Sequence, residues 1–170
     1  MSSGGGTLIQ FASFRELLEA EGSRKIIGFD VFDFFPEAKN DADKKFRDVW
    51  VKQTNNEFLT QEELYKSFKH KKIENVELIK GNILETAQEY VKNHPELKVA
   101  LLHIDTDIYE PAKEALEVFY DRVVKGGIIA FDDYGTVGGE TKAVDEFFDN
   151  KVRLQKLPFS YRKPSFIIKE

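Results

Sequence analysis

The sequence predicts an α/β fold in which a mostly parallel sheet lies between helices. Two stretches carry this prediction, residues 99–102 and residues 128–131, and each is an unbroken apolar run that is followed closely by acidic residues. Such runs are typical of strands buried on both faces, as in parallel sheets covered by helices. Between them, residues 111–124 place apolar side chains on one face at helical spacing, with Gly126 as the helix stop. A strand, a helix and a second strand predict a right-handed βαβ unit.

The composition favours a single folded domain over residues 1–170. The chain has 41% hydrophobic and 13% aromatic residues, enough for a sizeable core. Its net charge of −5 argues against nucleic acid as a partner, and the absence of cysteine excludes disulfides, thiol catalysis and zinc–thiolate sites. No apolar run approaches about 18 residues and no signal-peptide core is visible, so we expect a soluble, cytoplasmic protein with no membrane partner.

The first elements follow a glycine run, Gly4 to Gly6, which is either a flexible start or the end of a loop that approaches a cofactor. A helix is predicted next, and Gly22 ends it. Its inward face is expected to carry an apolar stripe formed by Leu8, Phe11, Phe14 (or Ala12), Leu17 and Leu18. Residues 25–30 then predict a strand that ends in an acid, Asp30.

An aromatic-rich insertion occupies residues 31–58, with a short helix predicted over 43–51. This insertion is either a lid over a site or cover for the core. Residues 60–63 form a capping box, which opens a helix with Leu64 and Phe68 facing inward.

The second half alternates strands and helices and ends in a β-rich tail. Residues 76–80 predict a strand, Gly81 and Asn82 a turn, and residues 83–93 a helix that stops before Pro95. After the two central strands, a helix is predicted over 141–149, and residues 152–161 and 164–169 are expected to pair as a hairpin at the end of the sheet.

Acidic residues follow both central strands, and ligands bind at this edge in open α/β sheets. Asp105, Asp132 and Asp133 are expected to converge there. Three carboxylates at one point repel each other unless a cation lies between them, and oxygen ligands suit Mg²⁺ or Ca²⁺. The structural alternative is that these acids cap the following helices or face water.

Three motifs together resemble the macrocin O-methyltransferase family: residues 102–111 (LHIDTDIYEP), 126–134 (GGIIAFDDY) and 27–32 (IGFDVF). Members methylate sugar hydroxyls of natural products with S-adenosylmethionine, typically with Mg²⁺. The resemblance covers roughly residues 4 to 149. It implies a Rossmann-like methyltransferase sheet, mostly parallel, with an antiparallel C-terminal strand and helices on both faces.

The resemblance also assigns site residues. Asp105, Asp132 and Asp133 would be the metal ligands, and Asp30 would accept hydrogen bonds from the cofactor ribose. The remaining cofactor contacts would come from the adenine turn and the opening loop, which correspond to Gly81, Asn82, Gly4, Gly5, Gly6 and Thr7. The first family strand is absent from this sequence. The chain is therefore expected to be a fragment, a natural short form, or a chain in which another segment, such as one from a partner in a homo-oligomer, fills the gap.

The predicted activity is methyl transfer to a hydroxyl of a small molecule, with Asp105 and His103 as the catalytic candidates. His103 is either the general base or a core residue of its strand. Two alternatives stay open: a non-catalytic module of the same fold that lacks cofactor affinity, and a metal-dependent hydrolase, which the lack of a basic phosphate-cradling loop disfavours.

Overall fold

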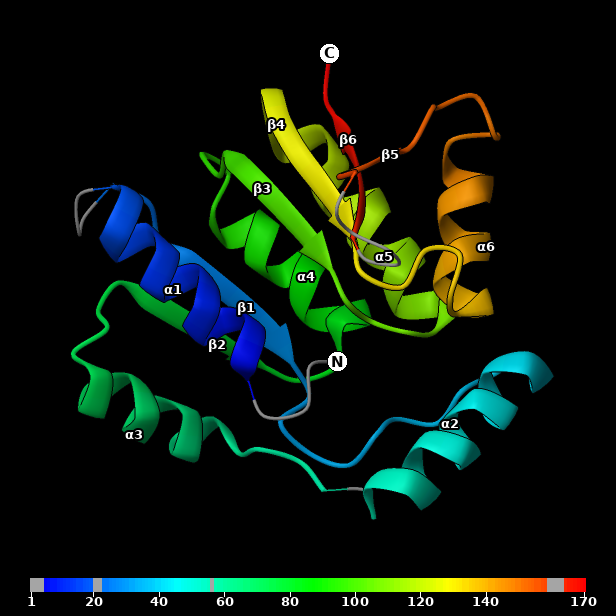
Figure 1. The fold of residues 1–170 in the computed structure, drawn as a ribbon, viewed down its shortest axis with the longest axis horizontal. Coiled ribbons are helices and arrows are strands. Elements are labelled where there is room, and N and C mark those ends of the chain that lie inside the picture. Colours follow the sequence, from blue (N-terminus) through cyan, green and yellow to red (C-terminus); the bar gives the residue numbers. More distant parts are fainter. Residues whose placement is uncertain (1–4, 20–22, 56, 159–163) are drawn as a thin grey trace. The chain divides into compact units, whose positions relative to one another are not determined.

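The structure is a computed structural model that describes residues 5–19, 23–55, 57–158 and 164–170. Its contacts divide the chain into two compact units, Met1–Pro36 with Trp50–Asn82, and Glu37–Val49 with Ile83–Glu170. Figure 1 shows the helices and strands of both units, which are α/β as the sequence predicts. Among the described residues, no helix has the length and apolarity needed to cross a membrane.

The first unit contains a two-stranded parallel sheet. Strand β1 (Ile26–Asp30) pairs in register with β2 (Val76–Lys80), from Ile26 opposite Val76 to Asp30 opposite Lys80. Helices α1 (Gly6–Leu18) and α3 (Gln61–Lys71) belong to the same unit. Its core cluster consists of Phe32, Leu64, Phe68 and Leu78. The predicted capping box of α3 is confirmed, because the side chain of Thr60 accepts from Glu63 N while the Glu63 carboxylate accepts from Thr60 N.

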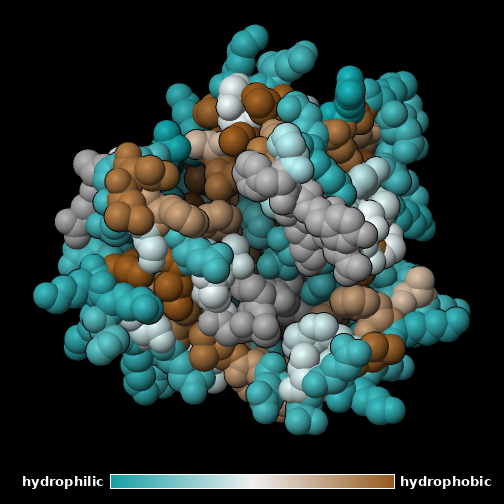
Figure 2. Space-filling view, in the orientation of Figure 1, coloured by the Kyte–Doolittle hydropathy of each residue, from teal (hydrophilic) through white to brown (hydrophobic). Residues whose placement is uncertain are grey.

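Helix α1 does not bury the stripe that the sequence predicts. Phe14, Leu17 and Leu18 are 56%, 78% and 80% exposed, whereas Ala12 and Arg15 are buried. Arg15 takes the inner face because its guanidinium donates to the carbonyls of Arg24, Asn75 and Glu74, at 3.0, 3.0 and 2.6 Å. The predicted burial of the apolar stripe is therefore wrong for the C-terminal half of this helix. These side chains are exposed instead, and Figure 2 shows apolar surface at its left side.

Helix α2 (Asp41–Thr54) lies in the aromatic-rich insertion and is longer than the predicted 43–51. Two aromatic pairs lie in this insertion, one of them with a ring on α2 itself. The rings of Phe35 and Trp50 have centroids 5.1 Å apart, and those of Phe34 and Phe58 are 4.9 Å apart. Phe35 is buried, whereas Phe34 is 60% exposed. Only some of the aromatic residues of the insertion therefore contribute to the core.

The second unit contains a four-stranded sheet in the order β3-β4-β6-β5. Strand β3 (Val99–Ile104) is parallel to β4 (Val123–Phe131), while β6 (Ser165–Ile168) is antiparallel to both β4 and β5 (Gln155–Lys156). The predicted antiparallel strands at the C-terminal end are thus confirmed. Helices α4 (Ile83–Asn93), α5 (Tyr109–Phe119) and α6 (Gly138–Phe147) lie side by side in Figure 1, with α5 contacting both others.

The crossover helix between the central strands is shorter than predicted. Helix α5 ends at Phe119, a 3₁₀ turn covers Tyr120–Arg122, and β4 already begins at Val123. Gly126 does have a positive φ of 81°, but it lies within β4, where the pairing with β3 shifts between Val99 and Leu101. Buried Val123 favours a strand because its β-branched side chain fits the pleated surface. Gly126 thus adopts its positive φ at an irregularity within β4 and does not end the helix.

Candidate functional site

The ends of β3 and β4 place two acidic turns next to each other. Ile104 is paired with Phe131, and the ladder continues one step further through a hydrogen bond from Asp132 N to Ile104 O of 2.9 Å. Because the strands are parallel, Asp105 and Asp132 leave the sheet at the same edge. The βαβ argument therefore predicts the meeting of the two turns correctly.

Three carboxylates gather at this edge: Asp105, Asp107 and Asp133. One oxygen from each lies within 4.8 Å of the others. Asp107 and Asp133 are 7% and 3% exposed, and Asp107 has a left-handed φ of 62°, which turns the chain between β3 and α5. Burial raises the pKa of Asp107 to about 6, and the neighbouring charge of Asp133 acts in the same direction. A cation would offset this crowding of negative charge, and three hard oxygen donors suit Mg²⁺ or Ca²⁺.

Asp132, the third acid of the predicted ligand set, does not belong to this group. Its Oδ1 lies 3.7 Å from Nε2 of His103 instead, and the two side chains are 26% and 17% exposed. His103 is on β3 directly before buried Ile104. The structure thus brings Asp105 and Asp133 together as predicted. The third acid near them is Asp107, and Asp132 lies beside His103 instead.

Glu140 is a further acid of this site, and the sequence reasoning missed it. It is completely buried in the first turn of α6, its Oε1 accepts from Asp133 N at 2.8 Å, and its Oε2 accepts from Thr106 N at 3.4 Å. Burial raises the pKa of Glu140 to about 8, the charges of Asp133 and Asp105 act in the same direction, and the two peptide donors oppose the shift. Its own N–H donates to Asp107 O at 3.2 Å.

Another buried acid, Asp43 of α2, holds the start of α5 at this edge. Its Oδ2 accepts from Tyr109 N, the first residue of α5, at 2.9 Å, and from Asn40 Nδ2 at 2.7 Å. A carboxylate is favourable there because the first peptide N–H groups of a helix have no partner within it. Gly139 lies against this contact, since a Cβ at that position would lie against Asp43 Oδ1 and 2.7 Å from Tyr109 N.

The predicted cofactor residues lie in the first unit, except that Gly4 is outside the described residues. Gly5 has a φ of 65° and is the N-cap of α1, which Gly6 and Thr7 begin. Asp30 ends β1, its Oδ1 accepts from Phe32 N at 2.8 Å, and its carbonyl accepts from Gly81 N at 3.0 Å. Gly81 has a φ of 140°, and Asn82 is exposed directly before α4. The turns that follow β1 and β2 therefore lie next to each other, linked by the hydrogen bond from Gly81 N to Asp30 O.

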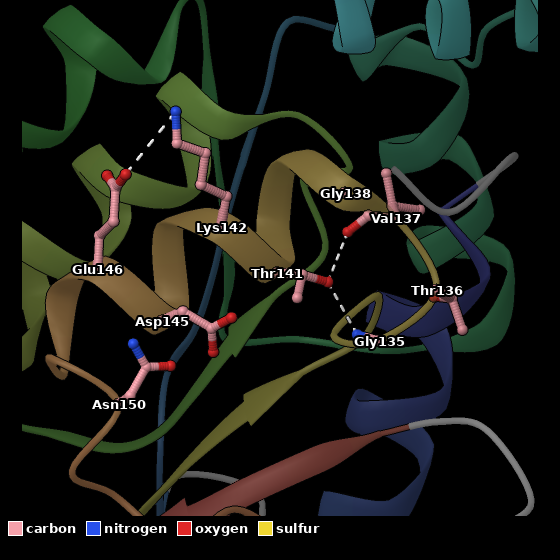
Figure 3. Close-up of a pocket in the computed structure, with 9 residues that line it drawn as sticks. All are labelled: Gly135, Thr136, Val137, Gly138, Thr141, Lys142, Asp145, Glu146 and Asn150. Atoms are coloured by element: carbon pink, nitrogen blue, oxygen red, sulfur yellow. Dashed lines mark hydrogen bonds and ion pairs between the residues drawn. The ribbon is translucent and has the colours of Figure 1, made fainter.

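An open hollow of about 500 Å³ lies beside α6, and Figure 3 shows the residues that line it, which are both polar and apolar. Thr136 lines it and connects it to the acidic group, because Thr136 Oγ1 lies 2.9 Å from Asp133 O and 3.4 Å from Asp133 Oδ1. Lys142 and Glu146 form an ion pair of 3.7 Å on the helix flank. The hollow offers donors and acceptors to a polar ligand.

Sequence signals existed for Glu140, which was missed, and for Asp107, which the sequence suggests as a residue that orients a ligand or caps the following helix. Glu140 precedes Ala143, Val144 and Phe147 at i, i+3, i+4 and i+7 spacing, so an acid stands on the apolar face of the helix. The expected start at residue 141 hid this, since α6 begins at Gly138. Asp107 follows Asp105 by two residues and the strand has already ended, so strand alternation no longer applies to it.

Parallel strands that end in acidic turns, with helical crossovers, are features of Rossmann-like α/β folds, the class to which Rossmann-like methyltransferases belong. The family model described as Macrocin-O-methyltransferase (TylF) matches residues 3–157. The chain belongs to the macrocin O-methyltransferase family. The comparison with curated proteins found no match.

Solved structures agree with this assignment. The crystal structure of CalS11, a calicheamicin methyltransferase, is 27% identical with a TM-score of 0.70, and the alignment covers 95% of this chain. An apo structure, described as that of CalS11, TDP-rhamnose 3′-O-methyltransferase, is 26% identical with a TM-score of 0.68 and covers 96% of this chain and 66% of the other. The O-methyltransferase NovP shares the fold, with 23% identity, a TM-score of 0.78 and coverages of 97% and 67%. This chain spans 66% of the length of CalS11.

Proposed function

We propose that this chain transfers a methyl group from S-adenosylmethionine to a hydroxyl of a small molecule, with a divalent cation assisting. One observation carries the proposal: in an O-methyltransferase family member, three carboxylate oxygens from the ends of β3 and β4 lie within 4.8 Å of one another. The acceptor class we propose is a sugar or a sugar-bearing natural product. The description of CalS11 as a TDP-rhamnose 3′-O-methyltransferase supports that class.

The cofactor would be held by residues of the first unit. Asp30 would accept hydrogen bonds from the ribose hydroxyls, and its bond from Phe32 N fixes the carboxylate for that contact. Gly81 and Asn82 would lie against the adenine, while Gly5, Gly6 and Thr7 would approach the cofactor at the start of α1. Gly5 and Gly81 have positive φ values, which glycine adopts without steric cost.

The cation would be held by Asp105, Asp107 and Asp133. When bound, it supplies charge that lowers the pKa of a coordinated hydroxyl and orients it. His103 would accept the proton that this hydroxyl loses as its oxygen bonds to the methyl carbon, the bond from that carbon to sulfur breaks, and S-adenosylhomocysteine leaves. Asp132, at 3.7 Å from His103 Nε2, would hold the imidazole in place, which is the role we assign it instead of metal ligation.

Calorimetric titration with S-adenosylhomocysteine, with and without Mg²⁺, tests the proposal. We expect binding, and we expect Asp30→Ala to weaken it roughly 10–100-fold, because the lost hydrogen bonds to a charged group are worth about 1.5–3 kcal/mol. Asp33→Ala is the matched control, since Asp33 is an exposed acid of the loop that follows β1.

Methyl transfer is then measured with labelled S-adenosylmethionine and a panel of nucleotide sugars and glycosides. Transfer that is lost in Asp105→Asn supports the metal-assisted reaction. Failure of the unaltered chain to bind S-adenosylhomocysteine in either metal condition would contradict the proposal and favour the non-catalytic module.

A further inference from the structure

Glu140 contacts both acidic turns of the site without belonging to the group of three acids. Its carboxylate accepts from the peptide N–H of Asp133 at 2.8 Å and lies 3.4 Å from the N–H of Thr106, the residue between Asp105 and Asp107. Its own N–H donates to Asp107 O at 3.2 Å. Glu140 therefore contacts the backbone of both turns that carry the three carboxylates, the turn after β3 and the turn after β4.

The local fold is built to let this side chain reach both turns. Gly139 brings the first turn of α6 against the start of α5, where a Cβ would lie 2.7 Å from Tyr109 N. Asp43 accepts from the same N–H at 2.9 Å and so holds the start of α5 in place. Glu140 itself is completely buried, which excludes water as a competitor for the two peptide donors.

We propose that Glu140 is a positioning residue for the metal site: by accepting from Asp133 N, and through its contacts with the Thr106–Asp107 turn, it fixes the carboxylates in the arrangement that binds the cation. The inference rests on the metal site of the proposed function. Residues that orient metal ligands through hydrogen bonds contribute to affinity because the ligands need no rearrangement when the ion arrives. Glu140 acts on the peptide groups that carry the ligands rather than on the ligands' own oxygens.

Two substitutions separate positioning from charge. Glu140→Gln and Glu140→Met both remove the carboxylate, but only glutamine retains an oxygen that accepts from Asp133 N. We expect Glu140→Gln to bind Mn²⁺ almost as the unaltered chain does, and Glu140→Met to bind it roughly 10–100-fold more weakly, in calorimetry and in the electron paramagnetic resonance spectrum of Mn²⁺. Glu117→Met, at an exposed acid of α5, is the matched control.

The outcomes distinguish this inference from the proposed function. Equal losses in both variants would assign the effect to charge, and no loss in Glu140→Met would leave Glu140 without a positioning role; either result overturns the inference alone. An unaltered chain that binds no Mn²⁺ would overturn the proposed metal site and this inference with it.

Amide hydrogen exchange of the unaltered chain provides a measurement that does not depend on the variants folding. If Glu140 holds the site before the ion arrives, the amide of Asp133 exchanges slowly in the presence of a chelator as well as with Mg²⁺. An Asp133 amide that exchanges freely until Mg²⁺ is added would overturn the inference.

Discussion

Two adjacent glycines at the start of α6 provide a stringent test of how the site is packed. A methyl group at position 139 would lie against Asp43 Oδ1 and 2.7 Å from Tyr109 N, whereas one at position 138 meets nothing within 4 Å. Both residues lie in the first turn of the same helix, so any gain in helix propensity is similar for both. Gly139→Ala and Gly138→Ala therefore differ mainly in steric overlap.

The magnitude follows from the two groups that the new methyl meets. Overpacking in a close-packed region costs about 1–3 kcal/mol. Displacing Asp43 from Tyr109 N also weakens a hydrogen bond to a charged group, worth about 1.5–3 kcal/mol. The helix gains at most about 1 kcal/mol from alanine. Because the two losses involve the same contact and are not additive, we expect Gly139→Ala to lower the free energy of unfolding by about 2 kcal/mol.

Thermal unfolding followed by circular dichroism measures the difference. For a chain of this size, about 2 kcal/mol corresponds to a fall in Tm of about 4–8 °C, whereas Gly138→Ala is expected to leave Tm unchanged or to raise it slightly. Equal Tm values for the two variants would refute the close approach of α6 to Asp43. That result would also contradict the inference that Asp43 and Gly139 position Glu140.

Two further predictions concern the capping box of α3 and the titration of the acidic site. Thr60→Ala removes the side-chain acceptor of Glu63 N and is expected to lower the free energy of unfolding by about 1 kcal/mol in urea titrations, while Ser67→Ala on the same helix changes it little. The pKa of Glu140 is raised to about 8 and that of Asp107 to about 6, so the folded chain retains protons that the unfolded chain has lost. In the presence of a chelator, Tm is therefore expected to fall as the pH rises from about 5 to about 8, and saturating Mg²⁺ should reduce the fall. A Tm that rises over this range would show that these acids are ionised without cost in the fold.

The elements that the sequence predicts well are those whose pattern is set by their own residues. The apolar runs before Asp105 and Asp132 form neighbouring parallel strands, and their shared direction places both acids at one edge. Leu101 and Ile128 are 44% and 39% exposed, so neither strand is buried on both faces as the sequence predicts. The capping box of α3 needs only Thr60 and Glu63, three residues apart, and it forms as predicted. The grouping of Asp107, rather than Asp132, with Asp105 and Asp133 is not visible in the sequence, because Asp107 lies after the end of β3 in a left-handed turn.

The residues that the sequence reasoning missed share one property: each is a charged side chain buried against peptide groups of other segments. Arg15 serves the carbonyls of Arg24, Glu74 and Asn75, and its place on the inner face leaves Leu17 and Leu18 exposed. An apolar stripe alone does not reveal this, because the burial of arginine depends on carbonyls that tertiary structure delivers.

Asp43 and Glu140 follow the same rule with the opposite charge. The start of a helix and the turn after a strand both leave peptide N–H groups without partners in their own element. Asp43 satisfies the N–H of Tyr109, and Glu140 satisfies that of Asp133. A buried donor left unpaired costs about 1–3 kcal/mol, so a carboxylate that accepts from it is favoured there despite the cost of its own burial. Glu140 stands at helical spacing with the apolar residues of α6 and directly after Gly139, whose missing side chain permits the close approach to Asp43, and both features are visible in the sequence.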